Sequence, residues 1–323
     1  MDLVGKVALI NPDYYSVWNY RRESILDTIK QEGRANMSHE ELQAELTLTV
    51  KAIKRNPKSY SAWHHRQWSL KQGLDQFFKE MESHQAGSEG AEQSQVKPQA
   101  KEPAPEPEPE EKEQDRDTSI LQNELELCQN LLEMDGRNFH CWTYRQWIVS
   151  LMDLPASEEF AFTTKKINQN FSNYSAFHCR SKLLPKYALE RGDTWGVIHE
   201  ELDMVHQAVF TEPDDQSAWW YHRFVVHYAS SIPEAEGADA QSTYGALLEA
   251  EVQCVRELLE VEPACKWALV TLESLLHQQQ SLASKAGHKQ EQVHALGQEM
   301  AGIIQQLQEI DPGHANYYKA LAL

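Results

Sequence analysis

Aromatic and apolar positions recur along the chain in short segments that have the spacing of an α-helix. The clearest segment is residues 56–68, which begins with Asn-Pro. Pro57 suits the first turn of a helix, where its missing N–H costs nothing. Tyr60 and Trp63 lie on one helical face, and Arg66 follows Trp63 by three residues and lies beside it. The pattern predicts a helix that needs similar neighbours to bury its aromatic stripe.

Versions of this segment occur at least five times. Their aromatic anchors are Trp18, Trp63, Trp142, Phe177 and Trp219, with steps of 45, 79, 35 and 42 residues. Four copies place an arginine three residues after the anchor: Arg21, Arg66, Arg145 and Arg180. In the fifth copy we assign this role to Arg223, four residues after the anchor, and a sixth, eroded copy covers residues 262–267. Steps of 35 to 45 residues fit a unit of two helices.

The segments ahead of these copies also have helical spacing. Leu42, Leu46, Val50 and Ile53 share one face, as do Leu121, Leu125, Cys128 and Leu132. Ser38 and Glu41 form a capping box before the first of them. We therefore expect an all-α fold, a right-handed α-α superhelix in which antiparallel helix pairs stack and leave a concave binding surface.

Residues 82–117 interrupt the repeats. They contain five prolines and eleven acidic against four basic residues, with almost no bulky apolar side chain. Such a segment cannot bury enough surface to offset the entropy of ordering, so we expect a disordered loop. We expect a single α-solenoid domain over 1–323, with about six to seven helix pairs around this insert. The apolar positions Leu3, Val7 and Ile10 predict only part of a first helix.

Composition narrows the function. The net charge is −19, which argues against nucleic acid as a main partner, because phosphate binding needs clustered cations. No apolar run is long enough to span a bilayer, and no signal peptide is visible, so we expect a cytoplasmic protein rather than an integral membrane protein. The five cysteines are scattered and suit reduced thiols. Adjacent histidines such as His64 and His65 point apart on a helix and make poor metal co-ligands.

The repeated pattern of a polar turn, an aromatic residue, a tryptophan and then an arginine resembles the repeat of protein prenyltransferase α subunits. Within that family, the sequence is most similar to the Rab geranylgeranyltransferase branch in four segments: 56–68, 137–142, 170–174 and 215–219. The resemblance implies a heterodimer in which the α subunit wraps a β subunit. It also implies transfer of geranylgeranyl from its diphosphate to C-terminal cysteines of Rab GTPases, which an escort protein presents. Zinc and the lipid pocket would lie in the β subunit, with no cofactor and no metal ligand in this chain.

The resemblance also implies a small contribution of this chain to the active site. Lys58 matches the lysine that meets the isoprenoid diphosphate, with Tyr60 beside it, while Asn138 and His140 match polar residues of the same rim. Phe139 stands where some members have tyrosine. Each residue also has an ordinary structural reading: Lys58 as a solvated lysine of a turn, Tyr60 as a residue of the helix packing, and His140 as a hydrogen-bonded histidine.

We read the tryptophan anchors as core, and we expect the four arginines to pair with carboxylates or helix ends of neighbouring repeats. Two other functions stay open. One is the α subunit shared by farnesyltransferase and type I geranylgeranyltransferase, and the other is a tetratricopeptide-like scaffold with no enzymatic partner. The Trp-x-x-Arg repeat and the single lysine at position 58 favour the enzyme subunit over the scaffold.

Overall fold

The structure is a computed structural model that describes residues 3–74, 109–232, 240–285 and 290–321. Within these ranges the secondary structure is helical, with no β-strand. The chain divides into two compact units, Met1–Leu154 and Pro155–Leu323, each of which is described by itself. The expected single domain over 1–323 therefore stays a prediction.

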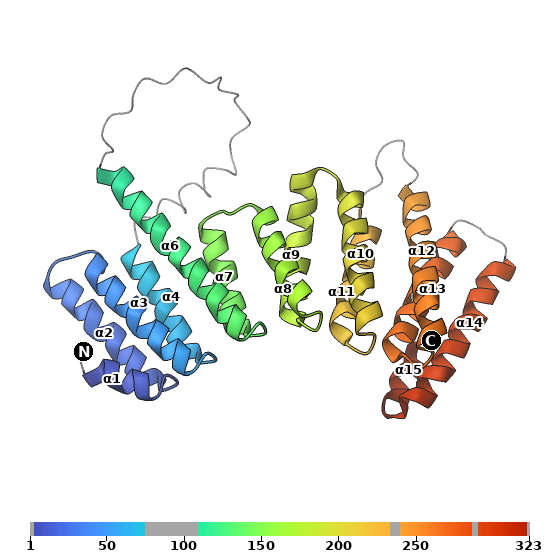
Figure 1. The fold of residues 1–323 in the computed structure, drawn as a ribbon, viewed down its shortest axis with the longest axis horizontal. Coiled ribbons are helices and arrows are strands. Elements are labelled where there is room, and N and C mark those ends of the chain that lie inside the picture. The colour runs from blue at the N-terminus through green and yellow to red at the C-terminus, as the bar shows by residue number, and fades with distance from the viewer. Residues whose placement is uncertain (1–2, 75–108, 233–239, 286–289, 322–323) are drawn as a thin grey trace, which may run out of the picture. The chain divides into compact units, whose positions relative to one another are not determined.

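The first unit holds three helix pairs within its described residues, and each helix packs against its partner (Figure 1). The helices are α1 (Leu3–Ile10), α2 (Tyr15–Gln31), α3 (His39–Arg55), α4 (Tyr60–Gly73), α6 (Pro109–Met134) and α7 (Phe139–Leu151). In each pair the earlier helix is called the first helix and the later one the second helix. The aromatic anchors Trp18, Trp63 and Trp142 all lie on second helices, as the repeat predicts.

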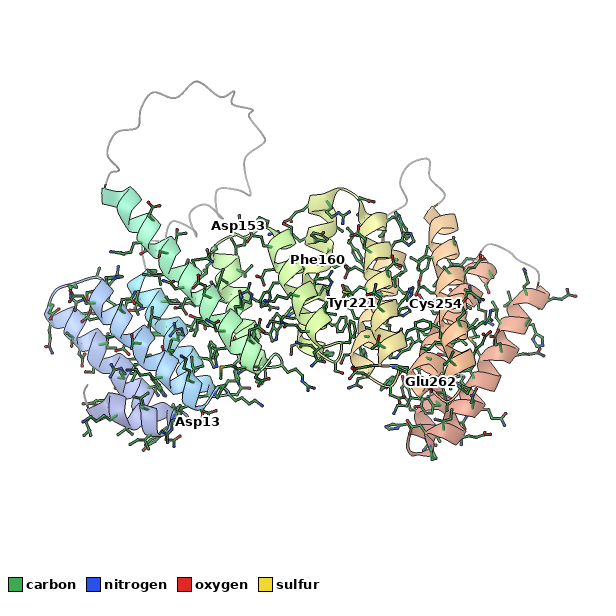
Figure 2. The ribbon with its side chains drawn as sticks, in the orientation of Figure 1. Asp13, Asp153, Phe160, Tyr221, Cys254 and Glu262 are labelled. Atoms are coloured by element: carbon green, nitrogen blue, oxygen red, sulfur yellow. The ribbon has the colours of Figure 1, made fainter. Side chains whose placement is uncertain are left out.

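The second unit continues the same arrangement (Figure 1). Its elements are α8 (Ala156–Gln169), α9 (Tyr174–Arg191), α10 (Thr194–Thr211), α11 (Gln216–Ser230), α12 (Ala240–Val261), α13 (Lys266–Lys285), α14 (Gln290–Ile310), the 3₁₀ turn η1 (Pro312–His314) and α15 (Ala315–Leu321). Successive helices of each pair contact one another, and side chains such as Tyr221 fill the space between them (Figure 2). The antiparallel helix pairs expected from the sequence are confirmed.

Local sequence signals explain where these helices begin. The capping box at α3 is present: the Ser38 hydroxyl accepts from the Glu41 N–H, and the Glu41 carboxylate accepts from the Ser38 N–H. Side chains of Asn138 and Asn173 cap α7 and α9 in the same position of the repeat. These caps satisfy backbone donors that a helix start leaves without partners.

Every tryptophan anchor is tied to the turn before its own helix. The indole Nε1–H donates to the backbone carbonyl six residues earlier, at 2.8 to 2.9 Å: Trp18 to Pro12, Trp63 to Pro57, Trp142 to Gly136 and Trp219 to Pro213. All four indoles are buried. The anchors are core residues, as expected, and their N–H groups also fix the path of the turn, because a buried indole N–H needs a partner.

Two expectations need correction. Helix α6 begins at Pro109, so residues 109–117 of the expected disordered insert are helical, whereas 82–108 lie outside the described residues. Proline at the start and glutamates in the first turn both favour a helix there.

In α1 the buried residues are Gly5 and Ala8, while Leu3 and Ile10 are exposed. Small residues let this short helix lie close to its neighbours, so the apolar pattern identified the wrong face.

Candidate functional site

The turn between α3 and α4 carries Lys58 and is held by hydrogen bonds on both sides. The Asn56 amide oxygen accepts from the Lys58 N–H at 3.2 Å. The hydroxyl of buried Ser59 donates to the Pro12 carbonyl at 2.7 Å, which fixes this turn against the equivalent turn of the preceding repeat. The Lys58 side chain is exposed, and within the described residues its ammonium group has no hydrogen-bond or ion-pair partner. The fold therefore holds the backbone and leaves the cation available.

Asn138 joins this turn to the next repeat. Its amide Nδ2 donates to the Pro57 carbonyl at 2.9 Å, and its Oδ1 accepts from the N–H groups of His140 and Cys141. The side chain is buried. Both ends of the amide are therefore used inside the protein, where they fix the backbone beside Lys58 and the start of the helix that carries His140. The expected contact of Asn138 with the diphosphate stays a prediction.

Exposed aromatic rings lie next to the lysine. Tyr60 is 69% exposed and Phe139 is 51% exposed, and each is the first residue of its helix. The Tyr60 ring meets His140 edge-on with centroids 4.2 Å apart and lies 6.1 Å from Phe139. Tyr60 is therefore not a buried residue of the helix packing, because position 60 points out of the repeat where Trp63 points in. It forms an accessible aromatic surface with Phe139.

His140 completes this cluster, which we call the rim site and define as Lys58, Tyr60, Asn138, Phe139 and His140. Burial lowers the pKa of His140, and the positive charge of Lys58 lowers it further. The imidazole is therefore neutral at pH 7. The rim site thus combines one free cation, a neutral imidazole, a phenol and two exposed aromatic faces. These groups suit an anionic ligand with an apolar part.

The sequence pattern also missed a residue near this site. Arg137 stands five residues before Trp142, just as Lys58 stands five residues before Trp63, and its side chain is exposed. In the first repeat the equivalent position is Asp13, whose carboxylate accepts from the Asn56 amide. Aligning the repeats on their anchors would have found Arg137 as a second cation of the same kind.

The repeated arginines have a different role. The Arg66 guanidinium donates from Nε and Nη2 to the Glu124 carboxylate at 2.6 Å, and from Nη1 to the Leu46 carbonyl and the Thr49 hydroxyl. Arg180 is held in the same way by Glu201, and Arg21 donates to Glu45. Arg66, Arg180 and their partners are almost fully buried. The expected pairing with carboxylates of neighbouring repeats is confirmed for these three arginines.

A buried glutamate with the side chains that bond to it is called a glutamate cluster. Glu124 also accepts from Tyr144, Glu201 from Tyr221, and Glu45 contacts the His65 Nε2. Each glutamate thus links the arginine of one repeat to a second helix of the next. Arg145 donates to the Leu125 carbonyl at 3.3 Å, so it also lies inside the helix packing.

The fifth repeat has histidines in place of the arginine. His222, not Arg223, is the residue three positions after Trp219, and its Nε2 lies 2.7 Å from Oε2 of Glu251. Our assignment of Arg223 to this role was wrong, because Arg223 is exposed and stands over the Trp220 ring. The Nε2 of His206 lies 2.9 Å from the same oxygen. Burial lowers the pKa of His206, but hydrogen bonds with Cys254 and Glu251 outweigh it and raise the value to about 10.

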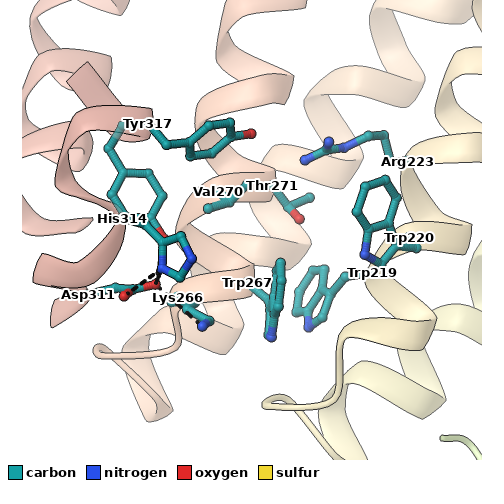
Figure 3. Close-up of a pocket in the computed structure, with 11 residues that line it drawn as sticks. Trp219, Trp220, Arg223, Lys266, Trp267, Val270, Thr271, Asp311, His314 and Tyr317 are labelled. Carbon is teal, nitrogen blue, oxygen red and sulfur yellow. Dashed lines mark hydrogen bonds and ion pairs between the residues drawn. The ribbon is translucent and has the colours of Figure 1, made fainter. Parts of the chain in front are cut away.

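A pocket of about 250 Å³ opens in the second unit between α11, α13 and the η1–α15 segment (Figure 3). Trp219, Trp220 and Trp267 form much of its wall, and Tyr317 faces them from the opposite side. At its edge Asp311 accepts from His314 and from Tyr318, and it pairs with Lys266 at 3.4 Å. The pocket can hold an apolar or aromatic side chain. The repeat pattern did not point to it, since only Trp219 belongs to an anchor position.

Comparison with known proteins identifies the repeat. The family described as protein prenyltransferase alpha subunit repeat matches residues 1–26, 42–73, 121–152, 156–187 and 198–229. Each of the five matches contains one of the aromatic anchors, and the second and third include residues of the rim site.

Curated relatives extend the match over the chain. A geranylgeranyl transferase type-2 subunit alpha from Dictyostelium discoideum is 34% identical over 319 residues, which are 98% of this chain and 82% of the relative. The protein of the same name from Schizosaccharomyces pombe is 32% identical over 216 residues, 61% of this chain and 60% of that protein. The one from Sus scrofa is 48% identical over 109 residues, 32% of this chain and 19% of that protein.

A solved structure has a similar fold. It is the Candida albicans protein geranylgeranyltransferase-I complexed with GGPP, with a TM-score of 0.61, 18% sequence identity, and coverage of 98% of this chain and 81% of that chain. The likeness supports the expected fold class, an α-α superhelix built from helix pairs. Among the helices of the described residues, none combines the length and the apolar character that crossing a membrane requires.

Proposed function

Because the chain belongs to the protein prenyltransferase alpha subunit family, we propose that it is the α subunit of a Rab geranylgeranyltransferase. The observation that carries the proposal is the similarity to the Dictyostelium type-2 alpha subunit over 98% of this chain. The chain spans only 19% of the pig relative and 60% of the fission yeast relative.

The two alternatives have less support. The curated relatives are named as type-2 alpha subunits, whereas the type I enzyme is similar in fold at only 18% identity. A scaffold of tetratricopeptide type would have no need for an exposed lysine whose ammonium group has no partner among the described residues. The family match also favours the transferase subunit over the scaffold.

The proposed enzyme acts in the cytoplasm as a complex. This chain pairs with a prenyltransferase β subunit, which holds the lipid pocket and a zinc ion. The substrates are geranylgeranyl diphosphate and a Rab GTPase presented by its escort protein. The type I neighbour is complexed with GGPP, which supports an isoprenoid diphosphate as ligand of the fold. Within this assembly the chain contributes its helical repeats, which pair with the β subunit, and the rim site.

The rim site would act on the leaving group. As the bond between the isoprenoid carbon and its oxygen breaks, negative charge grows on the diphosphate. A cation fixed beside that charge stabilises the transition state more than the ground state and so raises the rate. Lys58 has an exposed ammonium on a turn held by Asn56, Ser59 and Asn138, which suits this role. Tyr60 and His140 would contact the same ligand from beside the lysine.

Assembly and acceptor choice test the subunit assignment. The full chain is co-expressed with a type-2 β subunit and, separately, with a type I β subunit, and each copurified complex is assayed with labelled geranylgeranyl diphosphate. Two acceptors are compared: a Rab with its escort protein, and a short peptide that ends in the type I recognition sequence. We expect a stable complex with the type-2 partner and lipid transfer to the escorted Rab only.

Two results would contradict the assignment. Transfer to the peptide with the type I partner would make the chain a type I α subunit. Failure to copurify with either β subunit, from a chain whose circular dichroism shows intact helices, would favour the scaffold.

A further inference from the structure

The glutamate cluster around Glu251 differs in chemistry from the clusters around Glu124 and Glu201. In those two clusters a buried carboxylate faces a guanidinium, which carries a permanent positive charge. At Glu251 the arginine is replaced by His222, and His206 approaches from α10. A buried carboxylate needs a compensating cation, and two imidazoles provide one only when they bind a proton or a metal ion.

The geometry brings three ligand atoms to one point. One ring nitrogen of His206, one of His222 and a carboxylate oxygen of Glu251 all lie within 4.8 Å of one another. Both imidazoles approach the same oxygen of Glu251, at 2.9 and 2.7 Å. The three residues come from α10, α11 and α12, so helix packing rather than a flexible loop fixes their positions.

Two of the three side chains of the cluster are buried, and the third is partly open to solvent. The side chains of His222 and Glu251 are 2% and 5% exposed, whereas that of His206 is 26% exposed. An ion could therefore enter beside His206. Cys254 follows Glu251 by three residues on α12, and its thiol is close enough to His206 to raise the pKa of that imidazole, so it adds a soft donor near the open side.

We propose that His206, His222 and Glu251 form a binding site for a divalent transition-metal ion, with zinc as the preferred occupant. Two imidazole nitrogens and one carboxylate oxygen are a known zinc ligand set, with the fourth position left open. Zinc bonds of about 2.0–2.2 Å place tetrahedral ligand atoms about 3.3 Å apart, so each imidazole must move about 0.5 Å away from the Glu251 oxygen, while the two imidazoles stay within reach of one ion. Small side-chain rotations achieve this.

The surroundings of His222 determine how tightly we expect the site to bind zinc. A metal-bound histidine usually donates its second N–H to an acceptor, and losing that contact weakens binding by about 10–100-fold. The Nδ1 of His222 is buried and has no partner among the described residues. We therefore expect a dissociation constant on the order of micromolar, weaker than that of a structural zinc finger.

The test uses the full chain without an affinity tag that binds metal, and without any β subunit, so that no partner zinc contributes. The protein is stripped with EDTA, and zinc binding is measured by competition with a chromophoric chelator. Variants are His206→Gln and His222→Gln, with His65→Gln as the matched control. His65 is also a buried histidine bonded to a glutamate, but Arg21 already compensates that carboxylate.

We expect one zinc per chain for the wild type and for the control, and at least tenfold weaker binding for both cluster variants. Zinc should also raise the Tm of the wild type more than that of the cluster variants, since a ligand stabilises the folded state in proportion to how tightly it binds. His206 is partly exposed, so His206→Gln remains informative if His222→Gln fails to fold.

The proposal is overturned if the stripped wild type binds no zinc at tens of micromolar free metal. It is equally overturned if His206→Gln, with helices intact by circular dichroism, binds zinc as tightly as the wild type. In either case a proton alone would supply the positive charge beside Glu251.

Discussion

Two cations on either side of the same anchor, Trp63, behave in opposite ways. Arg66, three residues after the anchor, is buried and bonded to a carboxylate, a carbonyl and a hydroxyl. Lys58, five residues before it, is exposed and, among the described residues, unpaired. The arginine recurs in four repeats, whereas the position equivalent to Lys58 holds a cation in only two of the five repeats, as Lys58 and Arg137. The difference indicates that the recurring buried cation builds the fold and that exposed Lys58 is available for a ligand.

Removing the buried cation should have the largest effect. We expect Arg66→Ala to lower the free energy of unfolding by about 3–5 kcal/mol, because Glu124 would remain buried without its counter-charge. Urea denaturation followed by circular dichroism measures this. Arg55→Ala is the control, since Arg55 is exposed in the last turn of α3 and its loss should cost less than about 0.5 kcal/mol.

A double variant sharpens this prediction. Replacing both partners, with Arg66→Met and Glu124→Leu, should recover much of the loss, since an apolar pair leaves no buried charge. If Arg66→Ala were no more destabilising than Arg55→Ala, the structural role of the repeated arginine would be refuted.

Asn138 should give the next largest effect. Asn138→Ala removes both a helix cap and the donor to the Pro57 carbonyl, and we expect a loss of about 1–3 kcal/mol in the free energy of unfolding. Asn138→Asp keeps the cap acceptor but loses the donor, so it should fall between wild type and alanine. Equal stability of all three proteins would show that Asn138 does not hold the rim site together.

The smallest expected effect is a change in the pKa of His140. The charge of Lys58 lowers the pKa of His140 in addition to the effect of burial. We expect Lys58→Ala to raise the pKa of His140, because the imidazolium would no longer face a positive charge. An NMR titration of the histidine signals measures this, with His140→Gln to assign the resonance. An unchanged pKa would mean that the two side chains are farther apart than the rim site requires.

Much of the architecture was predictable because it is periodic. The spacing of Trp18, Trp63, Trp142 and Trp219 predicted the second helices, and their arginines predicted pairing with carboxylates. The partners themselves, such as Glu124 and Glu201, were not predicted, because they lie on first helices of the next repeat. Burial of those helices was inferred from apolar residues, and a glutamate on the same face carries no visible signal.

The rim site was predictable only in part. The resemblance placed Lys58, Tyr60, Asn138 and His140 in one cluster, and the structure brings these four residues together. Periodicity misjudged Tyr60, because the first residue of a helix shares the anchor's spacing but projects beyond the packed turns. It also could not reveal that the Asn138 amide is used twice inside the protein, since hydrogen-bond partners from another repeat are not encoded in local spacing.

The replacement of an arginine by His222 shows a further limit of pattern reading. Arg223 was nearby and carried the expected charge, so the sequence favoured it. Alignment on the Trp219 indole bond to Pro213 gives the correct register, because that bond fixes which residue lies three positions later. The hydrogen bond of the anchor indole, rather than the type of the neighbouring residue, shows which positions of two repeats are equivalent.

The most direct test of the central claim is a single-turnover transfer assay of Lys58→Ala in the assembled heterodimer, with Lys30→Ala as control. Lys30 is also an exposed lysine of the first unit, but it lies in the last turn of α2, far along that helix from the turn beside Lys58. The account predicts at least a tenfold slower transfer for Lys58→Ala, about 1.4 kcal/mol of transition-state stabilisation, with normal assembly and unfolding free energy. Transfer by Lys58→Ala at the rate of Lys30→Ala would contradict it.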